Sequence, residues 1–201
     1  ASFENTDLEL IKNVSKTKKP MIISLGMTKL NEIYDAVETA RSNGCKDLSL
    51  LKCTSSYPAN HDELNLETIR DLKKKFKCKI GFSDHTSDQV APIVAAAMGA
   101  EIIEKHFKLE SNIGLDSKFS MLAKDFKQLN ENCKLAKNSV GKIIYDLSRS
   151  ERRSVKNKRS LYFAEDLIKN SKIKKKHLLR LRPSKGIKIK NIKYLIGKKV
   201  S

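Results

Sequence analysis

Short apolar runs alternate with amphipathic segments along the first two thirds of the chain. Apolar runs of the kind that form buried strands lie at residues 20–26, 48–53, 79–83 and 101–107. Apolar residues recur at helical spacing in the segments that follow them, at 28–43, 66–76, 89–98 and 124–138. Strands that alternate with helices in this way form parallel sheets with helical crossovers. The pattern predicts an α/β fold, either a doubly wound sheet or part of a TIM (β/α)₈ barrel.

Polar side chains at the ends of the predicted strands favour the barrel. They follow four successive strands: Ser24, then Ser55 with Tyr57, then Ser83 with His85, and finally Glu104 with His106. A (β/α)₈ barrel builds its active site at this end, from several strands at once. Because side chains alternate between the faces of a strand, Ser83 and His85 should face one way and Phe82 and Asp84 the other. By the same rule, Glu104 and His106 share a face.

The number of predicted units is half of what a barrel needs. A complete barrel takes about 250 residues and eight strand–helix units, whereas four units, a strand tail at 1–4 and a helix near 8–14 are visible here. We therefore expect the C-terminal part of a longer protein, with a partial barrel over 1–140, from the end of its fourth strand through its eighth helix. Because an open half-barrel exposes strand edges, this fragment alone should be inactive and poorly soluble.

Charge divides the chain near residue 149. The net charge is +18, with 41 Lys and Arg against 23 Asp and Glu. Residues 149–201 hold 19 of those basic residues and only three acids, so almost all of the excess lies there. This step in composition predicts a linker over 141–158 and a small, incomplete β-rich domain over 159–201.

Composition also bears on the location and partners of the protein. The longest apolar run, residues 90–100, is too short to span a membrane, and four cysteines without a CxxC pair suit a reducing compartment, so we expect a cytoplasmic protein.

The basic segment raises the alternative of a nucleic-acid-binding protein. Against it, the segment offers only Tyr162, Phe163 and Tyr194 for base stacking and no recognition-helix motif. Anionic substrate steering is another use of the charge.

Several short motifs occur in an order that resembles the sialic acid synthase family. They are SFE at 2–4, ISLGM at 23–27, LKCTSSYP at 51–58, GFSDHT at 81–86, EKHF at 104–107, RSLY at 159–162 and Arg182-Pro183. In that family a barrel is followed by an antifreeze-like (SAF) domain. LDSKFS at 115–120 and LRPSKG at 181–186 look most like the pseudaminic acid synthases. Ser117 stands where many N-acetylneuraminate synthases have histidine.

The resemblance implies a metal-dependent condensation of phosphoenolpyruvate with an N-acetylated amino-sugar aldehyde. The enol carbon attacks the aldehyde, water adds to the resulting cation, and phosphate leaves by C–O cleavage. The expected product is pseudaminic acid, formed from 2,4-diacetamido-2,4,6-trideoxy-altropyranose. The alternatives are an N-acetylneuraminate or legionaminate synthase of the same family, and a non-catalytic remnant whose missing strands carried the lysines that hold phosphoenolpyruvate.

Strand geometry predicts a metal site. His85 and His106 end adjacent parallel strands on the inward face, where two neutral imidazoles with water and substrate oxygens suit Mn²⁺ or Mg²⁺. A divalent ion there would polarise the aldehyde oxygen. Glu104, on the same face, can orient an imidazole or act as an acid or base, although an ion pair with a lysine is as plausible a role for it.

The remaining candidate site residues depend on the resemblance. For phosphoenolpyruvate these are Ser2, Ser24, Ser55 and Ser83, and for the sugar Tyr57, Asp116 and Arg182. Glu4 is expected to contact the sugar or to move its proton. In the family the antifreeze-like domain of one subunit covers the active site of another, which brings Arg182 to the sugar. The resemblance therefore implies a domain-swapped homodimer.

Overall fold

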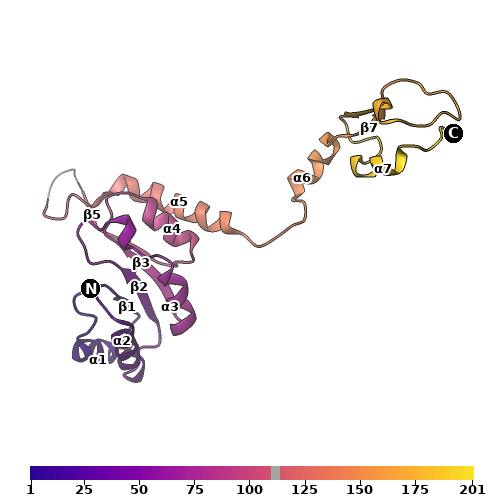
Figure 1. The fold of residues 1–201 in the computed structure, drawn as a ribbon. Coiled ribbons are helices and arrows are strands. Elements are labelled where there is room, and N and C mark those ends of the chain that lie inside the picture. Colours follow the sequence, from indigo (N-terminus) through magenta and orange to yellow (C-terminus); the bar gives the residue numbers. More distant parts are fainter. Residues whose placement is uncertain (110–113) are drawn as a thin grey trace. The chain divides into compact units, whose positions relative to one another are not determined.

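The computed structural model describes residues 1–109 and 114–201, which form two compact units, 1–142 and 143–201 (Figure 1). In chain order, the elements of the first unit are α1 (Leu8–Ser15), β1 (Met21–Ser24), α2 (Leu30–Ser42), β2 (Leu48–Cys53), η1 (His61–Glu63), α3 (Thr68–Phe76), β3 (Lys79–Asp84), α4 (Val90–Ala97), β4 (Ile103–Lys105), β5 (Phe107–Lys108), β6 (Met121–Leu122) and α5 (Ala123–Val140). None of the helices in the described part of the chain is both long and apolar enough to cross a membrane.

The sheet is parallel and its strands follow the chain order. β1, β2, β3 and β4 are hydrogen-bonded in that sequence. β5 continues from β4 after a one-residue break at His106 and pairs in parallel with β6. The single strand predicted over 101–107 is therefore wrong, because the chain changes pairing partner at His106. The strands form a curled half-barrel, and the α/β fold predicted from the alternating pattern is confirmed.

Alternation along the strands separates two faces, as predicted. One face carries the apolar core, in which strand residues such as Leu50, Ile80 and Phe82 meet helix residues such as Ile69 and Leu72. Each of these side chains is at most 2% exposed, and burying one such side chain stabilises the fold by about 1.5–3 kcal/mol. The opposite face carries the polar residues at the strand ends. Packing of the helices against one face of the sheet therefore fixes the position of the polar residues on the other face.

Residues 1–4 do not form the strand tail predicted from the sequence. The chain turns there, and the side-chain amide of the buried Asn5 donates to the carbonyl oxygens of Ser2 at 2.8 Å, Ser24 at 3.1 Å and Gly26 at 2.8 Å. These contacts fold the turn over the end of β1. Ser2 is therefore held beside the carboxyl end of the sheet by a side chain rather than by strand pairing.

The second unit is built around one antiparallel hairpin. Its elements are α6 (Arg149–Ser154), η2 (Val155–Asn157), β7 (Ser160–Phe163), η3 (Lys175–His177), β8 (Leu178–Leu181), η4 (Ile189–Asn191) and α7 (Ile192–Leu195). β7 pairs with β8 from Ser160 opposite Leu181 to Phe163 opposite Leu178. The segment predicted as a linker, 141–158, contains α6 and η2.

Candidate active site

Two histidines lie together at the ends of neighbouring strands. The β3–β4 register ends at Asp84 opposite Lys105, so His85 and His106 each follow the last paired residue of their strand. Their ring centroids are 5.2 Å apart. His85 is buried and the side chain of His106 is 34% exposed. The two rings therefore lie side by side at the end of the sheet, where the strand pattern places them.

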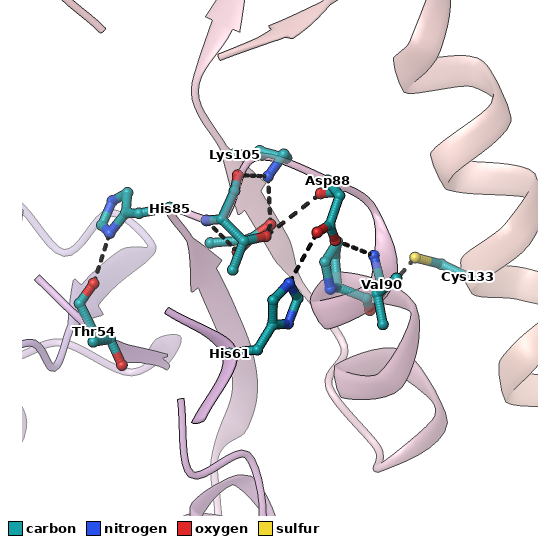
Figure 2. Close-up of polar contacts among 10 residues, drawn as sticks. Thr54, His61, His85, Asp88, Val90, Lys105 and Cys133 are labelled. Carbon is teal, nitrogen blue, oxygen red and sulfur yellow. Dashed lines mark hydrogen bonds and ion pairs between the residues drawn. The ribbon is translucent and has the colours of Figure 1, made fainter. Parts of the chain in front are cut away.

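The Nδ1 atom of each ring already has a partner. His85 Nδ1 lies 2.9 Å from the carbonyl oxygen of Thr54, a contact drawn in Figure 2, and His106 Nδ1 lies 3.2 Å from a carboxylate oxygen of Asp116. A carbonyl oxygen can only accept a hydrogen bond, so His85 Nδ1 is the donor in the first contact, and the neutral ring then has its lone pair on Nε2. No described residue contacts either Nε2 through a hydrogen bond or an ion pair.

This arrangement fits a metal ion. Histidines that bind metals usually donate their other ring N–H to a carbonyl or carboxylate, and each ring here has such an oxygen within 3.2 Å of its Nδ1 atom. The described residues contain no cluster of three or more His, Cys, Asp and Glu side chains with the geometry for an ion. The protein ligands available at this point are therefore the two imidazoles.

A group of hydroxyls lies beside the histidines at the ends of β1 and β2. Ser55 donates to the hydroxyl oxygen of Ser2 at 2.8 Å. Ser24 is 6% exposed, and its hydroxyl has no hydrogen-bond partner among the described residues. Gly26 permits this close approach, since a Cβ there would lie 1.9 Å from Ser55 Oγ and 2.8 Å from Ser2 Cβ. The buried free hydroxyl is a ready donor for an anionic ligand.

Glu104 is held by a hydroxyl rather than by a lysine. Ser83 Oγ donates to its Oε1 atom at 2.7 Å, and no described lysine forms an ion pair with it. Lys105, the adjacent residue, pairs with Asp84 on the opposite face. Glu104 therefore faces the histidine side of the sheet with its carboxylate oriented by Ser83.

Aromatic side chains border the two histidines. The Tyr57 ring lies 4.2 Å from His85 and 6.0 Å from His106 between centroids, and Phe119 lies 4.9 Å from His106. Phe3 stacks on the outer side of Tyr57 at 6.5 Å and is 63% exposed. These rings give the site an apolar wall next to its polar groups.

Cys53 is a site residue that the sequence pattern did not single out. Its Sγ lies 3.9 Å from His85 Nδ1 and 3.8 Å from Ser55 Oγ. Burial opposes ionisation of the thiol, but the contact with His85 and the nearby hydroxyls of Ser24 and Ser55 outweigh it and lower the pKa of Cys53 to about 7. Burial likewise opposes protonation of His85, but hydrogen bonds to Cys53 and to the Thr54 carbonyl raise the pKa of its imidazole. A signal was available, since Cys53 is in register with Ser83 and neighbours in register share a face.

Three predicted residues take other positions. Asp116 contacts His106, which is a place for orienting the imidazole and not only for a sugar contact. No hydrogen bond or ion pair in the described part of the chain joins the Glu4 carboxylate to either histidine. Arg182 lies in the second unit, directly after β8.

Arg182 begins a turn that the predicted motif residues hold in place. Tyr162 Oη and Ser160 Oγ both donate to the carbonyl oxygen of Pro183, at 2.5 and 3.1 Å. Gly186 N–H donates to Ser160 Oγ at 2.9 Å, and a Cβ at Gly186 would lie 2.3 Å from the carbonyl oxygen of Leu161. The RSLY motif therefore holds the turn formed by the LRPSKG motif.

Comparison with known proteins gives related sequences over the whole chain. A pseudaminic acid synthase from Campylobacter jejuni is 37% identical over 202 residues, which is 100% of this chain and 59% of that protein. An N,N'-diacetyllegionaminic acid synthase from the same species is 35% identical over 201 residues, covering 98% of this chain and 60% of that protein. The chain thus spans about three fifths of the length of these relatives.

The structural comparison agrees. The crystal structure of the N-acetylneuraminic acid (sialic acid) synthetase from Leptospira borgpetersenii in complex with citrate matches with a TM-score of 0.70 and 30% identity, over 77% of this chain and 54% of that one. The model of the NeuB family matches residues 1–145. The chain belongs to the NeuB family.

Proposed function

We propose that the protein containing this chain condenses phosphoenolpyruvate with an N-acetylated amino-sugar aldehyde, giving a nonulosonic acid and inorganic phosphate. The observation that carries the proposal is the pair of imidazoles, 5.2 Å apart between centroids, each with an oxygen atom beside Nδ1 and with no described residue bonded to Nε2. A divalent ion, Mn²⁺ or Mg²⁺, held by the two Nε2 atoms would polarise the aldehyde oxygen and make its carbon electrophilic.

The hydroxyl group provides the anion side of the site. Ser24, with its buried free hydroxyl, and the hydrogen-bonded pair Ser2 and Ser55 can donate to the phosphate or carboxylate of phosphoenolpyruvate. Such donors are favourable only when an acceptor is present, because a buried hydroxyl without a partner costs about 1–3 kcal/mol. An anionic ligand would remove that cost at Ser24.

Ser83 and Glu104 form the acid–base part of the proposed site. The Ser83 hydroxyl fixes one oxygen of the Glu104 carboxylate, which leaves the other free to accept a proton or to orient a water molecule. Glu4 is proposed to contact the sugar or move its proton. Tyr57 and Phe119 exclude water from one side of the histidines.

The proposed sugar substrate is 2,4-diacetamido-2,4,6-trideoxy-altropyranose, which gives pseudaminic acid. Synthases of that acid from Campylobacter jejuni and Helicobacter pylori are 36–37% identical to this chain. The aromatic wall offers an apolar surface for a sugar that carries a methyl group and acetamido groups. A legionaminate or N-acetylneuraminate synthase is the alternative within the family, since legionaminate synthases are 35% identical.

The second unit is proposed to act as an antifreeze-like domain in a homodimer, with Arg182 of one subunit reaching the sugar in the other. The exposed Arg182 stands at the start of a turn held by Ser160 and Tyr162, so its backbone is fixed before any sugar binds. A guanidinium is well suited to hydroxyl and carboxylate oxygens because it offers several donors in one plane.

The experiment measures phosphate release by the full-length protein from phosphoenolpyruvate with a panel of N-acetylated amino sugars and added Mn²⁺. His85→Ala and His106→Ala should each lower kcat by at least about a hundred-fold, the range that general acid–base or Lewis-acid groups supply. His61→Ala is the matched control, because His61 pairs with Asp88 at 2.9 Å on the surface and should leave turnover unchanged. Absence of phosphate release with every sugar, or near-normal turnover in either histidine variant, would overturn the proposal.

A further inference from the structure

A buried polar network lies on the outer face of the sheet, directly behind the two histidines. Lys105 Nζ contacts Asp84 Oδ2 at 2.5 Å and the carbonyl oxygen of Thr86 at 2.6 Å. Asp84 accepts two more hydrogen bonds from Thr86, from its N–H at 2.9 Å and its hydroxyl at 3.1 Å. The side chains of Asp84 and Lys105 are 0% and 1% exposed. We call Asp84, Thr86 and Lys105 the outer-face network.

The network occupies the positions that flank the histidines. Asp84 and Thr86 stand on either side of His85, and Lys105 immediately precedes His106. In Figure 2 the His85 ring points towards Thr54, whereas Lys105 and Asp88 lie on the other side of the strand. The histidines face one side and the network the other because side chains alternate along a strand.

Pairing between β3 and β4 does not extend to the histidines, whose carbonyl oxygens instead accept from Ala59 N–H at 3.0 Å and Met121 N–H at 2.8 Å. The β3–β4 register ends at Asp84 opposite Lys105, and the chain next pairs through β5 with β6. The contact from Lys105 to the Thr86 carbonyl crosses between the strand ends beyond that last pair. The outer-face network therefore fixes the relative position of the two segments that carry His85 and His106.

A stability role does not account for this choice of residues. Burying a Lys–Asp pair costs desolvation free energy that its attraction often fails to recover, and apolar replacements of buried pairs are often neutral or stabilising. The residues around it, Phe82 and Ile103, belong to or pack against the apolar core. An apolar pair at these positions would continue that core. The ion pair adds directional hydrogen bonds, by which Lys105 at the end of β4 is held to Asp84 and Thr86 at the end of β3.

We propose that Asp84 and Lys105 are positioning residues that hold His85 and His106 at the spacing needed to bind one divalent ion. The proposal rests on the metal-dependent function proposed above. Neither side chain touches the ion or the substrates. Their effect passes through the backbone of the adjacent histidines.

The test compares two double variants of the full-length protein by Mn²⁺ titration, followed by electron paramagnetic resonance. Asp84→Asn with Lys105→Met removes both charges and the Lys105 hydrogen bond to the Thr86 carbonyl, and it avoids leaving one charge buried alone. The asparagine oxygen can still accept from the Thr86 N–H. We expect a Kd for Mn²⁺ raised by about ten- to a hundred-fold, the usual range for residues that orient metal ligands. The visible spectrum of the Co²⁺-loaded protein should change as well, and thermal unfolding shows that the variant is folded.

The control pair is Lys73→Met with Glu101→Gln. Lys73 and Glu101 form an exposed ion pair at 2.8 Å near the opposite end of the same strands, and their loss should leave the Kd for Mn²⁺ unchanged. Wild-type affinity and an unchanged Co²⁺ spectrum in the folded Asp84/Lys105 variant would overturn the positioning role. If the wild type itself binds no Mn²⁺, or binds it equally well after His85→Ala, the proposed metal site fails instead.

Discussion

Substitution of Gly26 by alanine tests the packing of the hydroxyl group at the end of β1. A Cβ at this position would lie 1.9 Å from Ser55 Oγ, 2.8 Å from Ser2 Cβ and 3.2 Å from Cys53 Sγ. The Ser55 hydroxyl can rotate away, but this breaks its 2.8 Å hydrogen bond to Ser2. Ser2 can move only with its backbone, whose carbonyl is bound by Asn5. The variant should therefore lose both stability and affinity for phosphoenolpyruvate.

The magnitude follows from these contacts. Forcing a methyl group into a packed site costs about 1–3 kcal/mol, and the lost hydrogen bond contributes about 0.5–1.5 kcal/mol of it. Ser55→Ala removes the same hydrogen bond and also the closest atom. In the Ser55→Ala background, Gly26→Ala should cost about 1 kcal/mol less than in the wild type, a coupling in the range known for residues in contact.

Urea unfolding of the full-length protein, followed by circular dichroism, gives the free energies of unfolding of the wild type, Gly26→Ala, Ser55→Ala and the double variant. Ser83→Ala serves as the matched control, because its hydroxyl contacts Glu104 and not Gly26. The costs of Gly26→Ala and Ser83→Ala should therefore add within about 0.5 kcal/mol. Additivity of Gly26→Ala with Ser55→Ala to the same tolerance would refute the packing described here.

Two further predictions concern Asp116 and Asp88. Asp116→Asn should raise the Kd for Mn²⁺ about ten-fold, because the carboxylate that orients His106 is lost; unchanged Mn²⁺ affinity with a raised KM for the sugar would assign Asp116 to the substrate. Burial opposes ionisation of Asp88, but the Val90 N–H and His61 outweigh it and lower its pKa (Figure 2). Its contribution to stability is present above the unfolded pKa and lost as the pH falls through the lower folded pKa. The Tm difference between wild type and Asp88→Asn should therefore shrink below about pH 4, and a difference constant from pH 7 to 3 would contradict it.

Regular alternation explains why much of the site could be predicted. Strand, helix and face assignments depend on local periodicity, and periodicity alone is enough to place His85 beside His106 and Ser83 beside Glu104. The same rule would have found Cys53, which is in register with Ser83.

Contacts made by turns and loops could not be predicted in this way. Asn5 binds carbonyl groups up to 21 residues away, and Asp116 reaches His106 from a loop beyond β5. Such contacts have no regular spacing in the sequence, because the conformation of a loop depends on the surface against which it packs. The predicted strand at 1–4 failed for this reason, since a side chain and not a neighbouring strand holds that turn.

The outer face of β3 and β4 shows how a departure from pattern can itself carry information. Phe82 and Asp84 share a parity, so the periodicity that buries one also buries the other. A carboxylate at a core position conflicts with the local rule, and such conflicts are expected where function has a requirement that packing alone does not meet. Here the conflict lies one residue from His85, and its partner Lys105 lies one residue from His106. If the proposed metal site is correct, a charged residue at a core position next to an inward-facing histidine is a sequence signal for residues that position metal ligands.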